Sequence, residues 1–421
     1  RRFGRGVKHP IVLLFAAAFG LRLAYALFDF PVPPQDTADY DEIARNVLAG
    51  DGFVSRENWF GYEMRSWRPP LYPLFLALVY AVWGYSHLAV KVVQALVGAG
   101  TVVLVWALVR RLQPDAAPLA GGLALVYGPL VAICAEVMSE TLFCFWIVLA
   151  AWALVATEGR RPYLLLAGAA IGLAALTRPV GLLWLPAFAA VAVWRGRGAG
   201  LRQCAWVAVA VVAVIAPWSA RNAQVHGAWV PISTHGGFIL ARSNAFEPDW
   251  RKDDGWGITE AFFRRLPTEI ERDSYWYAQG TAFIVEHPGY YLRLVGERFV
   301  RLWYFFRPDY NLWFMMVMPF SLLGLRQYGQ RGNYAYLSSF IACSIFVFST
   351  VLYGSTRFRL PLEPLFIAFA AAYLSAVVRR WDRQRLLAVL GLVIGGNMLV
   401  WWQQEAARGL ALSMLNLLHL R

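Results

Sequence analysis

An acidic segment follows the first apolar stretch of the chain. It reads PVPPQDTADYDEIARNVLAGDGF and contains Asp36. Ionisable groups at the rim of a membrane are costly, so an aspartate here is a functional candidate whose carboxylate can accept a proton. A short helix is expected to begin near Thr37 or Asp39 and to end at Gly50 or Gly52. Asp36 could equally be the N-cap of that helix, worth about 1 kcal/mol, and the spacing leaves both interpretations open.

Glu140 is a second acidic candidate, because it lies where two apolar stretches meet. A glutamate that faces a helix bundle there could orient a substrate or bind a cation, and it could equally be a solvated turn residue. His226, His235 and His287 lack a ligand spacing such as HxH or HExxH. The histidines are therefore not assigned to a metal site.

The composition is that of a membrane protein. Of the 421 residues, 59% are hydrophobic and 15% are charged, and the mean hydropathy is +0.47. A soluble protein of this length needs more polar surface. The net charge of +13 comes largely from arginine clusters between apolar stretches, which indicates membrane topology and argues against nucleic-acid binding. Part of this surplus could attract anionic lipid or a phosphate-bearing substrate.

The expected fold is an all-α, polytopic bundle of about eleven transmembrane helices. The predicted spans are 11–28, 88–109, 117–134, 136–156, 163–177, 180–195, 203–220, 309–326, 334–353, 360–378 and 385–402. Alternate connections carry arginine clusters, which the positive-inside rule places in the cytoplasm together with the basic N-terminus. All clusters share one side only if Pro69 to Ser86 does not cross the membrane. That segment is therefore placed at the outer interface.

The loops divide the chain into five parts. These are an N-terminus with the first helix (1–28), a first extracytoplasmic loop (29–87), a transmembrane bundle (88–220), a large extracytoplasmic loop (221–308) and a C-terminal bundle (309–421). Within the large loop, residues 291–306 mix aromatic and aliphatic residues with Arg293, Arg298 and Arg301. This pattern predicts an amphipathic helix on the bilayer surface.

Short motifs follow one another along nearly the whole chain. They are Asp36 with Tyr40 and the 50–53 turn GDGF, 68–73 RPPLYP, 176–179 LTRP, 217–222 PWSARN, 230–237 VPISTHGG, 287–292 HPGYYL and 357–362 RFRLPL. In order and spacing they resemble the GT-C superfamily of glycosyltransferases. More narrowly, they resemble the bacterial family-39 type, relatives of aminoarabinose transferase and protein O-mannosyltransferases.

The resemblance implies an inverting transfer of a sugar from a polyprenyl-phosphate donor at the outer face of the membrane. Asp36 would be the general base that takes the proton of the acceptor hydroxyl. The planar fork of arginine suits phosphate, and snorkelling to lipid headgroups is the alternative for each arginine. The expected phosphate ligands are Arg68, Arg178, Arg357 and Arg359, and the expected acceptor or sugar contacts are Tyr40, Glu140, Asn222 and His235.

Some relatives bind a divalent ion through a glutamate beside a lysine, at the position where this chain has Trp67-Arg68. That glutamate is missing here, so no metal ligand is assigned, although a divalent cation stays an option. The expected partners are a polyprenyl-phosphate sugar, membrane lipids and an envelope glycan, lipid or protein as acceptor.

The expected location is the bacterial inner membrane, with the N-terminus in the cytoplasm and the site facing the periplasm. The alternative function is a transporter, flippase or binder of lipid-linked sugars. Transporters usually contain paired repeats, and this sequence has none that we detect.

Overall fold

The computed structural model describes residues 8–28, 35–56, 62–157, 159–196, 198–244, 264–303, 308–380, 382–403 and 413. Within these ranges the chain is almost entirely helical, and one isolated antiparallel bridge joins Ser55 to Met64. The predicted all-α fold is confirmed.

Apolar helices run through the whole described chain. Five are long and apolar enough to cross a membrane: Pro10–Phe28, His87–Leu112, Pro179–Gly196, Gly198–His226 and Thr356–Val378. Five shorter apolar helices are Leu71–Trp83, Glu140–Ala156, Arg161–Thr177, Tyr334–Thr350 and Leu387–Leu399. The protein is thus a multi-pass membrane protein.

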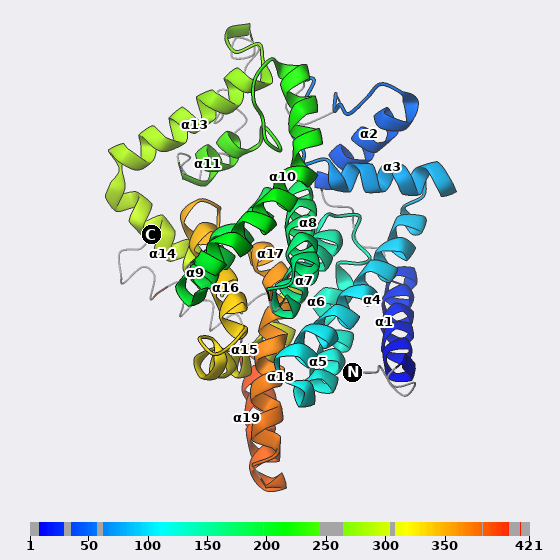
Figure 1. The fold of residues 1–421 in the computed structure, drawn as a ribbon, viewed down its shortest axis with the longest axis vertical. Helices are drawn as coiled ribbons and strands as arrows, with labels where there is room; N and C mark the ends of the chain where they lie inside the picture. Colours follow the sequence, from blue (N-terminus) through cyan, green and yellow to red (C-terminus); the bar gives the residue numbers. More distant parts are fainter. Residues whose placement is uncertain are drawn as a thin grey trace.

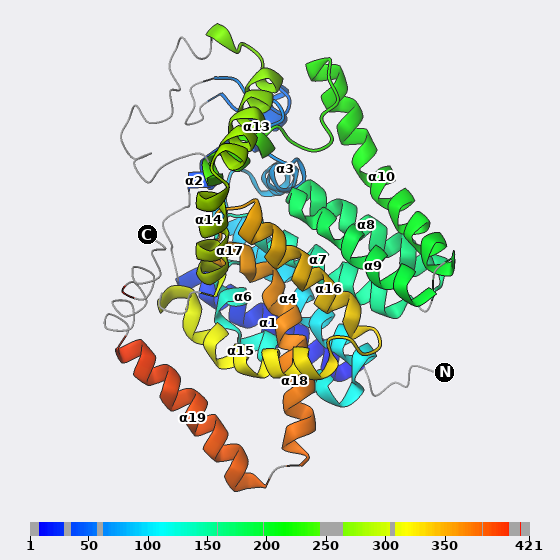
Figure 2. The ribbon, with the colours of Figure 1, turned by 90° about the vertical axis from the view of Figure 1, so that its left-hand side faces the viewer.

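The helices form a bundle with a smaller outer part at one end, uppermost in Figures 1 and 2. The bundle contains α1 (Lys8–Phe28), α4 (His87–Leu112), α5 (Ala117–Val126), α6 (Gly128–Ala132), α7 (Glu140–Ala156), α8 (Arg161–Thr177), α9 (Trp184–Gly196), α10 (Gly198–His226), α15 (Pro308–Tyr328), α16 (Tyr334–Thr350), α17 (Thr356–Arg359), α18 (Glu363–Val378) and α19 (Arg383–Trp402). The outer part contains α2 (Gln35–Ala49), α3 (Leu71–Trp83), α11 (Gly236–Asn244), α13 (Glu269–Glu286) and α14 (Pro288–Leu302).

The predicted span 117–134 differs from the structure, because it is broken into α5 and α6. Pro129 opens α6 and has no backbone N–H to continue the preceding helix. Arg22 of α1 is buried and donates to the carbonyl oxygens of Ala124 at 3.2 Å and Leu125 at 3.4 Å. It thereby satisfies carbonyl groups that the end of α5 leaves without a helical partner.

Helix α2 carries the acidic segment and ends where the sequence predicts. Gly50 and Gly52 follow it with φ values of +87° and +85°, which favour glycine. The helix begins at Gln35, so Asp36 stands inside its first turn. Helix α3 packs on α2 and α4 and lies crosswise to α1 (Figures 1 and 2). The interfacial position of this segment stays a prediction.

Helix α10 connects the bundle to the outer part. Its 29 residues extend about 44 Å at 1.5 Å per residue, more than the roughly 30 Å of hydrocarbon. Its C-terminal end therefore reaches the outer part, as Figure 2 shows. There the two long loops share a small core of Met64, Trp67, Phe238, Ala241 and Trp276.

Helix α14 is the amphipathic helix expected in residues 291–306, of which 304–306 lie outside the described residues. Arg298 does not face headgroups. It is buried and donates to Asn244 Oδ1 at 3.0 Å and to the Thr350 carbonyl oxygen at 3.1 Å. Arg298 therefore fastens α14 to α11 and α16.

Candidate active site

Asp36 lies between two arginines from distant parts of the chain. Its Oδ1 accepts a hydrogen bond from Arg68 Nη2 at 2.7 Å, and its Oδ2 accepts one from Arg357 Nη1 at 3.0 Å. Arg68 precedes α3, and Arg357 stands in α17, 321 residues after Asp36. The carboxylate thus lies inside the first turn of α2 and binds guanidinium groups from two other segments, which a simple N-cap would not do.

Glu140 extends this arrangement from the other side of Arg357. Its Oε1 accepts hydrogen bonds from Arg357 Nε and forms an ion pair with Arg178 Nη1 at 2.7 Å. Glu140 begins α7, and Arg178 follows α8. The side chain is buried, so Glu140 is not a solvated turn residue. Its other oxygen, Oε2, is buried and accepts no hydrogen bond from the described residues.

Asp39 belongs to the same cluster and was not singled out from the sequence. Its Oδ2 accepts from Arg68 Nε at 3.0 Å and from Nη2 at 2.6 Å. The Arg68 guanidinium also lies over the Tyr40 ring, 5.2 Å from its centroid, and Tyr40 packs edge-on against Tyr72. The sequence feature that could have identified Asp39 is its i, i+3 spacing from Asp36, which brings both carboxylates to one side of a helix.

The cluster alternates three carboxylates with three guanidinium groups, so its formal charges balance. Burial alone would raise the pKa of the Asp36 carboxyl, but Arg68 and Arg357 outweigh burial and hold it well below its usual range. Asp36 and Arg357 keep 31% and 34% of their side-chain surface exposed, against 3% for Glu140. A substrate can therefore reach the cluster at Asp36 and Arg357.

Comparison with known proteins identifies the architecture. A profile of the family described as dolichyl-phosphate-mannose-protein mannosyltransferase matches residues 67–220. The crystal structure of ArnT from Cupriavidus metallidurans bound to undecaprenyl phosphate has a TM-score of 0.58 at 16% identity, over 95% of this chain and 72% of ArnT. The chain has the GT-C fold.

A second GT-C structure agrees. The oligosaccharyltransferase AglB from Archaeoglobus fulgidus, in complex with an inhibitory peptide and a dolichol-phosphate, has a TM-score of 0.57 at 15% identity. The match covers 96% of this chain and 56% of AglB. The search of curated proteins finds no match. The family profile includes Arg68, Glu140 and Arg178 but neither Asp36 nor Arg357, so the structure is needed to bring these two groups of residues together.

Arg359 lies apart from the cluster in this GT-C fold. It is buried, pairs with Glu363 Oε1 at 2.9 Å and donates to the Leu302 carbonyl oxygen at 2.5 Å. A guanidinium enclosed in this way is not available to a substrate phosphate. The structure thus brings together three of the four arginines that the resemblance implied.

Asn222 and His235 have partners of their own beside the cluster, in the segment that precedes Arg68. Asn222 is fully buried and bonds to Ser66 and to backbone carbonyl groups. His235 packs on Trp67 with 4.3 Å between ring centroids. Burial, reinforced by the nearby Arg68 charge, lowers the pKa of His235 to about 3. His235 is therefore neutral at physiological pH and adds no positive charge to the cluster.

The described residues do not fit a divalent-ion site. Among them, no three His, Cys, Asp or Glu side chains gather where they could hold an ion. Both oxygens of Asp36 and one of Glu140 are already bound to arginines.

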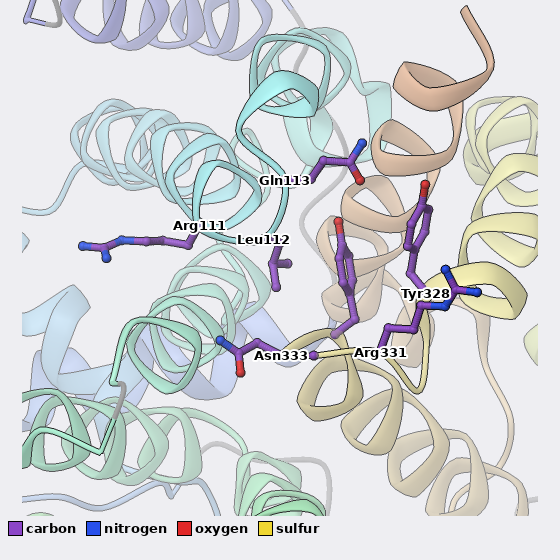
Figure 3. A pocket seen from close by; sticks show the side chains of 8 residues that line it. Arg111, Leu112, Gln113, Tyr328, Arg331 and Asn333 are labelled. Atoms are coloured by element: carbon purple, nitrogen blue, oxygen red, sulfur yellow. The ribbon is translucent and has the colours of Figure 1, made fainter. Parts of the chain in front are cut away.

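A cavity of about 270 Å³ lies far from this cluster, between the α4–α5 and α15–α16 connections (Figure 3). It is lined by Arg111, Leu112, Gln113, Tyr328, Arg331, Gly332, Asn333 and Tyr334. Figure 3 shows Arg111 and Arg331 extending in opposite directions. The lining contains no carboxylate, so this cavity offers no base for group transfer.

Proposed function

We propose that the protein transfers a sugar from a polyprenyl-phosphate donor to an acceptor hydroxyl. The observation that carries this proposal is Asp36 held between Arg68 and Arg357 in a GT-C fold, with 31% of the Asp36 side chain exposed. A carboxylate and adjacent guanidinium groups are the two kinds of group that such a transfer needs. The bound undecaprenyl phosphate of ArnT and dolichol-phosphate of AglB support this donor class.

The reaction exchanges one bond at the anomeric carbon of the sugar. The acceptor oxygen bonds to that carbon from the face opposite the phosphate, and the bond between the carbon and the phosphate oxygen breaks. The acceptor proton passes to Asp36, and polyprenyl phosphate leaves with the electron pair. Arg68, Arg178 and Arg357 stabilise the negative charge that grows on the phosphate.

Donor binding also activates the base. In the ligand-free arrangement, the two arginines hold the pKa of Asp36 well below its usual range, which makes its carboxylate a weak proton acceptor. A phosphate that binds the arginines takes a share of their positive charge. The pKa of Asp36 then rises, and the carboxylate becomes a stronger base only when the donor is in place.

The site is proposed to face the outside of a bacterial inner membrane, with the N-terminus in the cytoplasm. The arginine clusters of the bundle support this orientation. Arg111 and Arg331 both line the cavity of Figure 3, at the end of α4 away from α3. The positive-inside rule assigns that end to the cytoplasm and Asp36 to the opposite side.

The test compares the wild type with Asp36→Asn as purified full-length chains. Each is given a panel of polyprenyl-phosphate sugars and crude envelope acceptor, and the release of polyprenyl phosphate is measured. We expect Asp36→Asn to lose at least about 100-fold in rate, because general-base catalysis typically supplies 10²- to 10⁴-fold. Asp115→Asn is the matched control, since Asp115 is exposed and pairs with Arg379 at the other end of the bundle.

Equal release by wild type and Asp36→Asn would remove Asp36 from the mechanism. Binding of the lipid-linked sugars by the wild type without release from any donor would favour a transporter or a binding protein. Thermal melting of all variants separates loss of catalysis from loss of folding.

A further inference from the structure

The segment that precedes Arg68 is held by a buried carboxylate from the large loop. Glu269, the first residue of α13, accepts hydrogen bonds from the backbone N–H groups of Arg65 at 2.9 Å and Ser66 at 3.1 Å. The same carboxylate also accepts from the Thr234 hydroxyl. Burying a carboxylate is costly unless its oxygens are hydrogen-bonded, and here both oxygens are.

The end of α10 holds the same segment from another direction. Asn222 Oδ1 accepts from Ser66 Oγ at 2.9 Å, and Arg221 Nη1 donates to the Arg65 carbonyl oxygen at 2.7 Å. The backbone N–H of Thr234 donates to the Ser66 carbonyl oxygen at 2.9 Å. The motifs PWSARN and VPISTHGG thus meet at this segment.

These contacts fix the direction in which the Arg68 side chain projects from the backbone. The backbone of Ser66 is bonded through both its N–H and its carbonyl group, and Trp67 is packed against His235 and Phe238. Arg68 is the next residue. Its guanidinium must meet Asp36 and Asp39 at 2.6 to 2.7 Å. A small rotation of the backbone at residue 66 would move that guanidinium out of reach, since orientation at such sites is sensitive to shifts of about 1 Å.

We infer that Glu269 is a positioning residue for Arg68, so that the large extracytoplasmic loop helps to build the phosphate site. The claim that Arg68 binds a phosphate rests on the proposed function. The claim that Glu269 holds residues 65–68 in place does not depend on it.

The test uses the full-length chain and two substitutions on one helix. Glu269→Gln keeps the side-chain shape but replaces one acceptor oxygen by an NH₂ group that faces a donor. Glu271→Gln is the matched control, because Glu271 lies two residues further on α13, is exposed, and accepts only from the N-cap residue Thr268 among the described residues, a bond that glutamine keeps. Two quantities are measured: hydrogen–deuterium exchange of the peptide around residues 62–72, and the equilibrium Kd for undecaprenyl phosphate in detergent.

For Glu269→Gln we expect faster exchange in residues 62–72 and a roughly tenfold higher Kd, with a melting temperature close to that of the control. Glu271→Gln should match the wild type in both measurements. Unchanged exchange in Glu269→Gln would overturn the inference outright. Faster exchange with an unchanged Kd would make Glu269 a structural residue only. If the wild type binds no undecaprenyl phosphate, the proposed function fails, while the exchange data still decide whether Glu269 fixes this segment.

Discussion

Arg357 is the side chain that joins the two halves of the ion-pair cluster. It binds Asp36 through Nη1 and Glu140 through Nε, so one planar group spans two carboxylates. This role depends on the geometry of guanidinium more than on its charge. Lysine carries the same charge on a single nitrogen and cannot reproduce two bonds in one plane.

We therefore expect Arg357→Lys to lower kcat/KM for the donor by roughly 10- to 100-fold, because a lost charge-assisted hydrogen bond is worth about 1.5–3 kcal/mol. Initial rates over a range of donor concentrations measure this. Arg301→Lys is the control, since Arg301 is exposed on α14 and pairs with Glu297, four residues before it on the same helix. If Arg357→Lys kept wild-type kinetics as the control does, a single positive charge would suffice at residue 357. The planar geometry of the guanidinium group would then have no role.

The residues of the cluster could be found from sequence only in part. Asp36, Arg68 and Arg178 stand beside apolar stretches, where a charged group is unusual enough to be noticed. Which arginine meets which carboxylate could not be read, because Arg357 and Asp36 are 321 residues apart and their contact depends on how the helices pack. Arg359 illustrates this limit, since contacts with α14, α15 and α18 enclose it beside Glu363.

At the scale of elements, helix positions follow from the sequence more closely than helix contacts do. Apolar length predicts the spans, and Gly50 predicts the end of α2, because both signals are local. The break between α5 and α6 also has a local cause in Pro129, but Arg22 stabilises it from α1. In the large loop, local signals mark only the helices themselves, such as the capping box of Thr268 and Glu271 at the start of α13. The way α11 and α13 pack depends on their contacts with the first loop, which the sequence does not reveal.

The α11–α13 contact contains a carboxyl group with a raised pKa. Asp273 of α13 accepts from the backbone N–H of Gly237 at 2.7 Å, at the start of α11. Burial raises the pKa of Asp273 to about 7 against an ordinary 3.8, although the Gly237 hydrogen bond acts in the opposite direction. Between pH 3.8 and pH 7, the Asp273 carboxyl is thus protonated in the folded protein and ionised in the unfolded chain. Its contribution to stability is greatest at low pH and is lost as pH rises through this window.

Asp273→Asn should remove this pH dependence, because asparagine keeps an acceptor oxygen and does not ionise. We expect the variant to be more stable than the wild type at pH 8 by on the order of 1 kcal/mol, and equal to it near pH 4. Melting temperatures in detergent at the two pH values provide the measurement. A variant that is less stable at pH 8 would mean that the ionised carboxylate stabilises the contact with Gly237.

At the scale of the whole molecule, the two ends of the bundle differ in structure and in charge. One end carries the large loop, α2, α3 and the Asp36 cluster, and the other carries short connections with Arg111, Arg195 and Arg331. A reaction catalysed at one face of the membrane agrees with this asymmetry. Alternating access would instead need related structures on both sides of a central site.

The orientation can be tested with one cysteine at each end. The native cysteines Cys134, Cys144, Cys204 and Cys343 are buried or half-buried and are first replaced. Glu271→Cys then reports on which side of the membrane the large loop lies. Arg202→Cys reports the same for the start of α10, where the side chain is exposed. In cells with a permeabilised outer membrane, a maleimide that cannot cross the inner membrane should label Glu271→Cys alone.

Arg202→Cys should react only after the inner membrane is opened, because the positive-inside rule holds its basic connection in the cytoplasm. The reverse pattern would place Asp36 and the large loop in the cytoplasm and would contradict a reaction at the outer face. Labelling of both positions in intact inner membranes would indicate a mixed orientation. In that case, replacing Arg195 by glutamine in both reporter chains should shift the ratio further, since the positive-inside rule makes basic connections a determinant of orientation.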